Sequence, residues 1–363
     1  MTHRARIAAT CSACVGIIVL GLSTLAVADG SIHHSPKHRA DERFVATTHI
    51  SPRVQWEANF GYCGETSFIS AGLSYGQYLS QYDARSLASD GKDQSQDGSQ
   101  LLLGVNDAHA ARAMHLAFTS WKPSPGATSS QFLSWVKQQV FQGRPVIMGV
   151  YNNEYRLYGK TSPNAGDSEY DHIVSVTRII SDSPPNNSLA SSPDDTISFD
   201  DHGLWTGADL AAGQSFTYRF GAFPGSRRQA NARTGPIYRL PDHTIDYGIS
   251  ITGVADPTHE TLPVRLISRT NSEGQSMKDG SALRPKPQAI RLTAIVSGLT
   301  PGSTYNLYRY DSAAKVPDRA FNAHQSLASQ TWHFRATSTT FTVSEEFMSS
   351  DEVFYRAVPT GGA

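Results

Sequence analysis

The chain has 363 residues, which is enough for two domains of ordinary size, each able to bury its own core. Charged residues make up 17% of the chain and the formal net charge is −1, which excludes the basic surface expected of a protein that binds nucleic acid or anionic lipid. The 29 glycines, 19 prolines and 10% aromatic residues are typical of a turn-rich fold with much β-structure.

The N-terminus has the pattern of an export signal. Arg4 and Arg6 precede the apolar stretch Val15–Val27, and a small-x-small cleavage pattern ends at Ala28. The stretch is shorter than the roughly 18–20 apolar residues that a membrane-spanning helix needs, and no second candidate follows it. The sequence therefore predicts a signal peptide over 1–28 and a mature chain with no membrane span. The predicted location is extracellular, or periplasmic if the host is a bacterium.

Residues 29–50 are polar and rich in His and Ser, which indicates a loose leader. From residue 51 to about 240, helical patterns come first and strand patterns follow, which predicts a first domain over 51–240. Apolar residues recur at helical spacing in three segments, residues 63–82, 107–118 and 129–140. Short apolar runs bounded by turn residues predict three strands, residues 145–151, 172–179 and 196–200.

The sequence pattern changes at Tyr247 from mixed helix and strand to strand alone. Alternating, β-branched and aromatic runs separated by turn residues predict seven strands and no helix over 247–363, the pattern of a separate β-sandwich. The turn Leu299–Tyr305 resembles the one that enters the tyrosine-corner strand of fibronectin type III modules. A true module has one strand after that turn, whereas about fifty residues remain here. A binding role for this sandwich, toward a surface, a glycan or a protein, is left open.

The number and positions of the cysteines indicate a reactive thiol. Cys11 and Cys14 lie inside the predicted signal peptide, so the mature chain keeps Cys63 alone. A lone cysteine in an oxidising compartment is either a reactive thiol or a small buried hydrophobic residue. Cys63 follows the Gly-containing turn Asn59-Phe60-Gly61-Tyr62 and opens a helix. There the helix dipole and the unpaired N–H groups favour the thiolate.

A thiolate that attacks a carbonyl needs a proton carrier and an acceptor that orients it. His172 begins a predicted strand after the polar lead-in Tyr170-Asp171, so the sheet fixes its backbone. His202 is the competing histidine. Twenty-eight residues after His172, the strand 196–200 runs into a turn that presents Asp200 and Asp201. Strand alternation allows only one of these carboxylates to face the imidazole. An apolar core face favours Asp201, whereas the pattern of the family that these residues resemble, named below, favours Asp200 when it is aligned through Gly203.

These residues together resemble the papain superfamily. Their order is a cysteine at a helix start, a Gly-Arg-Pro-Val-Ile strand, Asp-His-Ile-Val-Ser-Val and an aspartate at a strand end. The resemblance is closest to the branch of peptidases that remove double-glycine leaders, and it covers residues 50–205. It implies an α+β papain-like catalytic domain ahead of the all-β sandwich.

The resemblance also implies roles for individual residues. Cys63 would be the nucleophile, His172 the general base, and Asp200 or Asp201 the residue that orients it. An upstream glutamine would stabilise the oxyanion. Gln55 is the nearest one, eight positions before Cys63 and two more than the family usually has, and Asn59 is the alternative donor.

The sequence thus predicts a secreted cysteine peptidase, or a related thiol amide- or acyl-transfer enzyme, acting on a peptide or protein substrate. It predicts no cofactor, no metal and no nucleic-acid partner. The alternative is a secreted, non-catalytic binding protein that uses a degenerate papain-like fold together with the sandwich.

Overall fold

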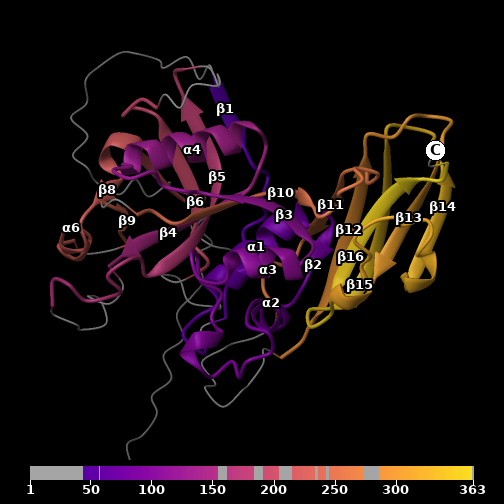
Figure 1. Ribbon diagram of the computed structural model, residues 1–363, viewed down its shortest axis with the longest axis horizontal. Helices are drawn as coiled ribbons and strands as arrows, with labels where there is room; N and C mark the ends of the chain where they lie inside the picture. The colour runs from indigo at the N-terminus through magenta and orange to yellow at the C-terminus, as the bar shows by residue number, and fades with distance from the viewer. Residues whose placement is uncertain are drawn as a thin grey trace, which may run out of the picture.

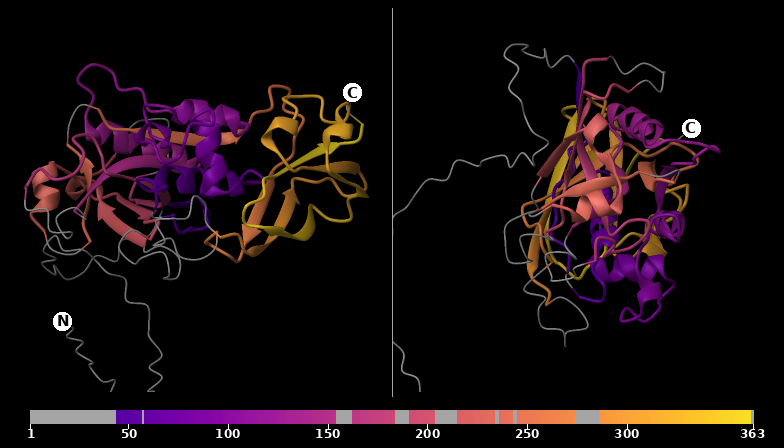
Figure 2. Two further views of the ribbon diagram at one scale, coloured as in Figure 1. Left: turned by 90° about the horizontal axis from the view of Figure 1, so that it is seen from below. Right: turned by 90° about the vertical axis from the view of Figure 1, so that its left-hand side faces the viewer.

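The computed structural model describes residues 44–56, 58–153, 162–183, 191–203, 215–233, 236–242, 245–273 and 286–361. The predicted signal peptide and most of the predicted leader lie outside these ranges. Figure 1 shows two units along the long axis of the molecule, a larger one built mainly from residues before 255 and a smaller one built from the yellow C-terminal strands. The left view of Figure 2 shows the same two units from below.

The larger unit is built on a nine-stranded sheet whose central order is β3-β10-β4-β5-β6-β7. Neighbouring strands along this order run antiparallel. Strand β1 pairs with β5, and β9 joins β4 to the short β8. The strands are β1 (Phe44–Thr47), β3 (Leu116–Ser120), β4 (Val146–Asn152), β5 (His172–Ser181), β6 (Thr196–Asp200), β7 (Ser215–Arg219), β8 (Pro224–Gly225), β9 (Tyr238–Pro241) and β10 (Gly248–Val254).

Helices cover both faces of this sheet. In β4, Val146 and Met148 share an apolar cluster with α4, whereas Ile147 between them belongs to the cluster of α1. Alternation along the strand thus places α4 on one face and α1 on the other. The helices are α1 (Cys63–Leu73), α2 (Gln81–Ala88), α3 (Asp107–Ala113), α4 (Ser129–Phe141) and α6 (Arg227–Asn231), with 3-10 turns η1 (Asp97–Ser99), η2 (Phe220–Ala222), η3 (Ala313–Lys315) and η4 (Gln325–Leu327).

The smaller unit consists of two antiparallel sheets that share one apolar core. One has the order β11-β12-β15 and the other β14-β13-β16-β2. Tyr305 Oη accepts a hydrogen bond of 2.9 Å from Thr300 N, the geometry of a tyrosine corner. The strands are β2 (Gln77–Tyr78), β11 (Val264–Ser268), β12 (Ala289–Ser297), β13 (Thr304–Tyr310), β14 (Gln330–Arg335), β15 (Thr340–Met348) and β16 (Val353–Pro359).

The two units are joined by more than a linker. Strand β2 leaves the larger unit and pairs with β16 of the smaller one. Gly76, just before β2, has φ +72°, and a Cβ there would lie 2.9 Å from the Val264 side chain, so only glycine fits this approach. The sequence places a boundary at 240–247, whereas β10 at 248–254 is a central strand of the first sheet.

The predicted α+β papain-like class is wrong for this chain. The described residues form sixteen strands and five α-helices, and the longest helix has 13 residues, so the fold is predominantly β. The predicted helix over 63–82 ends at Leu73, and the chain then turns at Gly76. The predicted helix over 107–118 ends at Ala113, because His115 takes φ +53° and strand β3 follows.

Other predicted elements are present. The helix over 129–140 is α4, the strands over 145–151, 172–179 and 196–200 are β4, β5 and β6, and all seven C-terminal strands are found. In the described part of the chain, no helix combines the length and the apolar character that crossing a membrane requires.

Candidate active site

Cys63 is the first residue of α1, at the end of a tight turn. Asn59, Phe60 and Gly61 have φ angles of +49°, +71° and +84°, and this left-handed run reverses the chain into the helix. Tyr62 provides no side-chain cap, so the first N–H groups of α1, including that of Cys63, have no partner within the helix. The positive end of the helix dipole therefore lies at the cysteine. The thiol is free and partly exposed.

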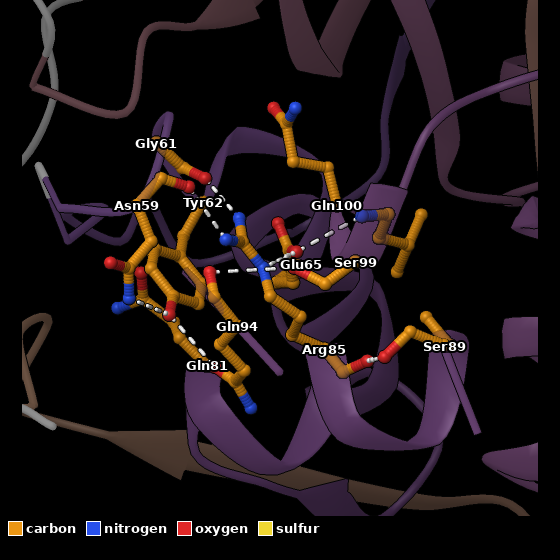
Figure 3. Close-up of polar contacts among 12 residues, drawn as sticks. Asn59, Gly61, Tyr62, Glu65, Gln81, Arg85, Ser89, Gln94, Ser99 and Gln100 are labelled. Atoms are coloured by element: carbon orange, nitrogen blue, oxygen red, sulfur yellow. Dashed lines mark hydrogen bonds and ion pairs between the residues drawn. The ribbon is translucent and has the colours of Figure 1, made fainter. Parts of the chain in front are cut away.

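A buried ion pair holds this turn in place (Figure 3). Arg85 Nε donates to Glu65 Oε1 at 2.6 Å, and both side chains are almost completely buried. Two further Arg85 nitrogens donate to the carbonyls of Asn59 and Gly61. Its guanidinium also lies 3.5 Å from the centre of the Tyr62 ring. A buried charged side chain, each of whose three nitrogens donates a hydrogen bond, thus fixes the backbone just before Cys63.

His172 begins β5 and is buried. The adjacent strand fixes its backbone, because His172 pairs with Val150 of β4. Its Nε2 lies 3.6 Å from Asp201 Oδ1. This separation exceeds an ordinary hydrogen bond, so the contact is a buried ion pair, and long contacts of this kind are common in active sites without substrate. Since Nε2 faces the carboxylate, Nδ1 is the nitrogen available to the Cys63 thiol, which is close enough to help raise the pKa of His172.

The surroundings of His172 favour its charged form. Burial alone lowers the pKa of His172, but the nearby Asp201 carboxylate and Cys63 sulfur outweigh it and raise the pKa to about 10. A charged imidazole beside a cysteine is the arrangement that activates a thiol nucleophile.

The two adjacent aspartates point in different directions. Asp200 is the last residue of β6 and lies opposite Ser175 of β5, and Asp201 follows it toward the end of the sheet that carries His172. Asp200 instead has Ser215 as its hydrogen-bond partner. Burial raises the pKa of Asp200 to about 7. Of the two candidates in the sequence, Asp201 is therefore the one beside the imidazole.

Gln55 lies against the turn that leads into Cys63. A Cβ on Gly61 would be 3.8 Å from Gln55 Nε2, so the amide faces this turn. The Gln55 side chain is buried, with 4% exposed, and its Oε1 makes no hydrogen bond within the described part of the chain. Its backbone N donates to His202 O at 2.8 Å. The position of Nε2, the donor atom of this amide, against the turn that leads into Cys63 suits a donor to a bound carbonyl oxygen.

His202, the competing histidine, has a different position. Its Nε2 lies 2.7 Å from Ser67 Oγ, and that hydroxyl is also 2.8 Å from the carbonyl of Cys63. Nδ1 lies 3.3 Å from Arg53 O. Burial and the nearby His172 charge lower the pKa of His202 to about 3, so its ring is neutral. His202 therefore ties the nucleophile helix to the segment that carries Gln55, a role that the sequence does not reveal.

Cys63 opens into a cavity of about 630 Å³. One wall comes from the Phe60 turn and residues 97–105, where Leu101 N donates to Glu65. The other comes from residues 167–171 and Tyr247. Asp171 holds this second wall, because its carboxylate pairs with Arg227 and accepts a hydrogen bond from Asp167 N.

No protein-family model, curated protein or solved structure matches this chain. Within the described ranges, no three His, Cys, Asp or Glu side chains gather as metal ligands would. The fold brings together Cys63, His172, Asp201 and Gln55 from four separate segments and leaves Asp200 aside.

Proposed function

We propose that this chain is a secreted cysteine peptidase, or a related thiol amide- or acyl-transfer enzyme, with Cys63 as nucleophile, His172 as general base and Asp201 as the residue that orients the imidazole. The observation that carries the proposal is one histidine between two partners. Its Nε2 lies 3.6 Å from the Asp201 carboxylate, and its other nitrogen is left for the partly exposed thiol at the start of α1. The order of these residues resembles that of the papain superfamily, in particular its double-glycine-leader peptidases.

The reaction follows from this arrangement. The Cys63 thiolate attacks the substrate carbonyl carbon, a C–S bond forms, and the carbonyl π electrons move to oxygen. Gln55 Nε2 and the Cys63 N–H are the two donors available for that oxyanion. His172 Nδ1 then protonates the leaving nitrogen as the C–N bond breaks. Water, deprotonated by the same imidazole, or another nucleophile releases the acyl group.

A polypeptide is the substrate class that suits the cavity. Its two walls are separate chain segments, each held by a buried ion pair, so an extended chain can lie between them with a carbonyl at Cys63. The smaller unit, joined to the larger one through β2, would add a second binding surface to the same molecule.

The test compares the mature chain with its Cys63→Ser variant on a complex peptide mixture, with new termini identified by mass spectrometry. We expect new termini only with the cysteine form, together with a mass increase on Cys63 when the reaction is quenched in acid. If both forms leave the mixture unchanged while still retaining peptides, the chain is the non-catalytic binding protein.

A further inference from the structure

Phe60 occupies an unusual conformation at the edge of the candidate active-site cavity. Its φ of +71° is rare for a bulky residue, and strain of this kind is concentrated at functional sites. The carbonyls on either side of it, those of Asn59 and Gly61, both accept hydrogen bonds from buried Arg85, which explains how the conformation is maintained.

Internal packing does not account for the Phe60 ring. The side chain is 65% exposed and belongs to none of the apolar clusters among the described residues. Val105 lines the same cavity and is 75% exposed. Only seven large apolar side chains are exposed in the described ranges, and these are the two most exposed. Two such side chains beside one nucleophile indicate a surface that a ligand covers.

The charged side chains that line the cavity are all acidic. Asp97, Asp167 and Glu169 line it and are exposed, and no described lining residue is Lys, Arg or His. The fourth lining carboxylate, Asp171, is already paired with Arg227. A ligand that carries positive charge is therefore complementary to the walls, and one that carries negative charge is repelled.

We propose that the cavity recognises polypeptide segments in which an apolar side chain, packed on Phe60 and Val105, adjoins a cationic residue that faces Asp167 and Glu169. This inference rests on the proposed function, because it takes the bound chain to be the substrate of Cys63. The left-handed turn at 59–61 then presents the Phe60 ring to the substrate, and the Glu65–Arg85 pair keeps that turn rigid.

The test measures binding without chemistry. Four fluorescein-labelled Gly/Ser decapeptides with Leu-Lys, Leu-Glu, Ser-Lys or Ser-Glu at their centre are titrated with the Cys63→Ser variant and followed by fluorescence anisotropy. We expect the Leu-Lys peptide to bind at least about tenfold more tightly than the Ser-Lys peptide, as burial of one leucine side chain predicts. The preference for Lys over Glu should decrease as ionic strength rises.

Two variants assign each preference to its residues. Phe60→Asn keeps a residue that tolerates positive φ and should remove the preference for Leu. Asp167→Asn combined with Glu169→Gln should remove the preference for Lys. Leu327→Asn, an exposed apolar residue in the smaller unit, is the matched control and should change neither.

Equal affinity for the four peptides, tighter binding of the Glu peptides, or no binding by ~1 mM would overturn the inference, given that specific complexes are tighter than this. Failure of the proposed chemistry is a separate result. It would appear as selective binding by the Cys63→Ser variant with no cleavage of the Leu-Lys peptide by the cysteine form.

Discussion

Replacement of Asp201 by asparagine removes the charge that faces His172 and leaves the shape of the side chain almost unchanged. In the native protein the imidazolium is kept through neutral pH and is lost as the pH rises through the raised pKa of His172, about 10. The two side chains are 2% and 0% exposed, so solvent screens their interaction little. The Asp201→Asn substitution should therefore act directly on the pKa of His172.

The size of the effect follows from the geometry. For a charge separation of 3.6 Å, Coulomb's law with an effective dielectric constant of about 20 gives about 5 kcal/mol. One pH unit corresponds to about 1.4 kcal/mol, so the pKa of His172 should decrease by roughly three pH units. Because burial also disfavours the imidazolium, the variant should carry a neutral imidazole at about pH 8.

The direct assay is an NMR titration of the ring nitrogens in protein labelled with 15N-histidine. The alkaline limb of any catalytic pH profile should move to lower pH by the same amount, and the rate should fall by two to four orders of magnitude, roughly as for other triads that lose this carboxylate. Asp200→Asn is the matched control and should leave the His172 titration in place. If the pKa of His172 shifts by less than about one pH unit in Asp201→Asn, or by the same amount in Asp200→Asn, the Asp201 charge is not what raises it.

Three further predictions concern the residues around this pair. Cys63→Ser should abolish turnover and leave the melting temperature nearly unchanged, because the thiol lines a cavity; a loss of several kcal/mol would mark it as a core residue. Gln55→Ala should lower kcat by about 10²–10³ with little change in KM, as loss of one oxyanion donor does; equal effects on both would contradict that role. Glu65→Gln should lower the free energy of urea unfolding by about 3–5 kcal/mol, because buried Arg85 loses its counter-charge. Asp90→Asn, in an exposed pair with His109, should cost less than about 1 kcal/mol.

Two local features of the candidate site could be predicted from the sequence, whereas the fold class could not. Cysteine at the start of a helix and histidine at the start of a strand are local patterns, and both are found at the predicted positions. Strand alternation on an apolar face favours Asp201, and that residue lies beside the imidazole. Alternation alone leaves both Asp200 and Asp201 open, because the choice also depends on how the turn after β6 meets β5.

The fold class could not be predicted because the helical patterns continue past the points where the helices end. Apolar residues persist at helical spacing after Leu73, but β2 there pairs with β16, which lies about 275 residues later in the chain. Similarly, β10 enters the sheet between β3 and β4 although its sequence resembles the strands that follow it. The role of His202 depends on contacts with Ser67 and Arg53, which no spacing in the sequence indicates.

The central claim is that His172 activates Cys63, and the rate of thiol alkylation by iodoacetamide tests it most directly. A chain that begins at residue 29 contains one cysteine, so the modified residue is unambiguous. We predict rapid alkylation at about pH 6.5 that falls by at least tenfold in His172→Ala, whereas the His109→Ala control reacts like the native chain. The opposite result is slow alkylation of the native chain at that pH, with a rate that rises only in the alkaline range. If His172→Ala then reacts at the same rate, His172 does not activate Cys63.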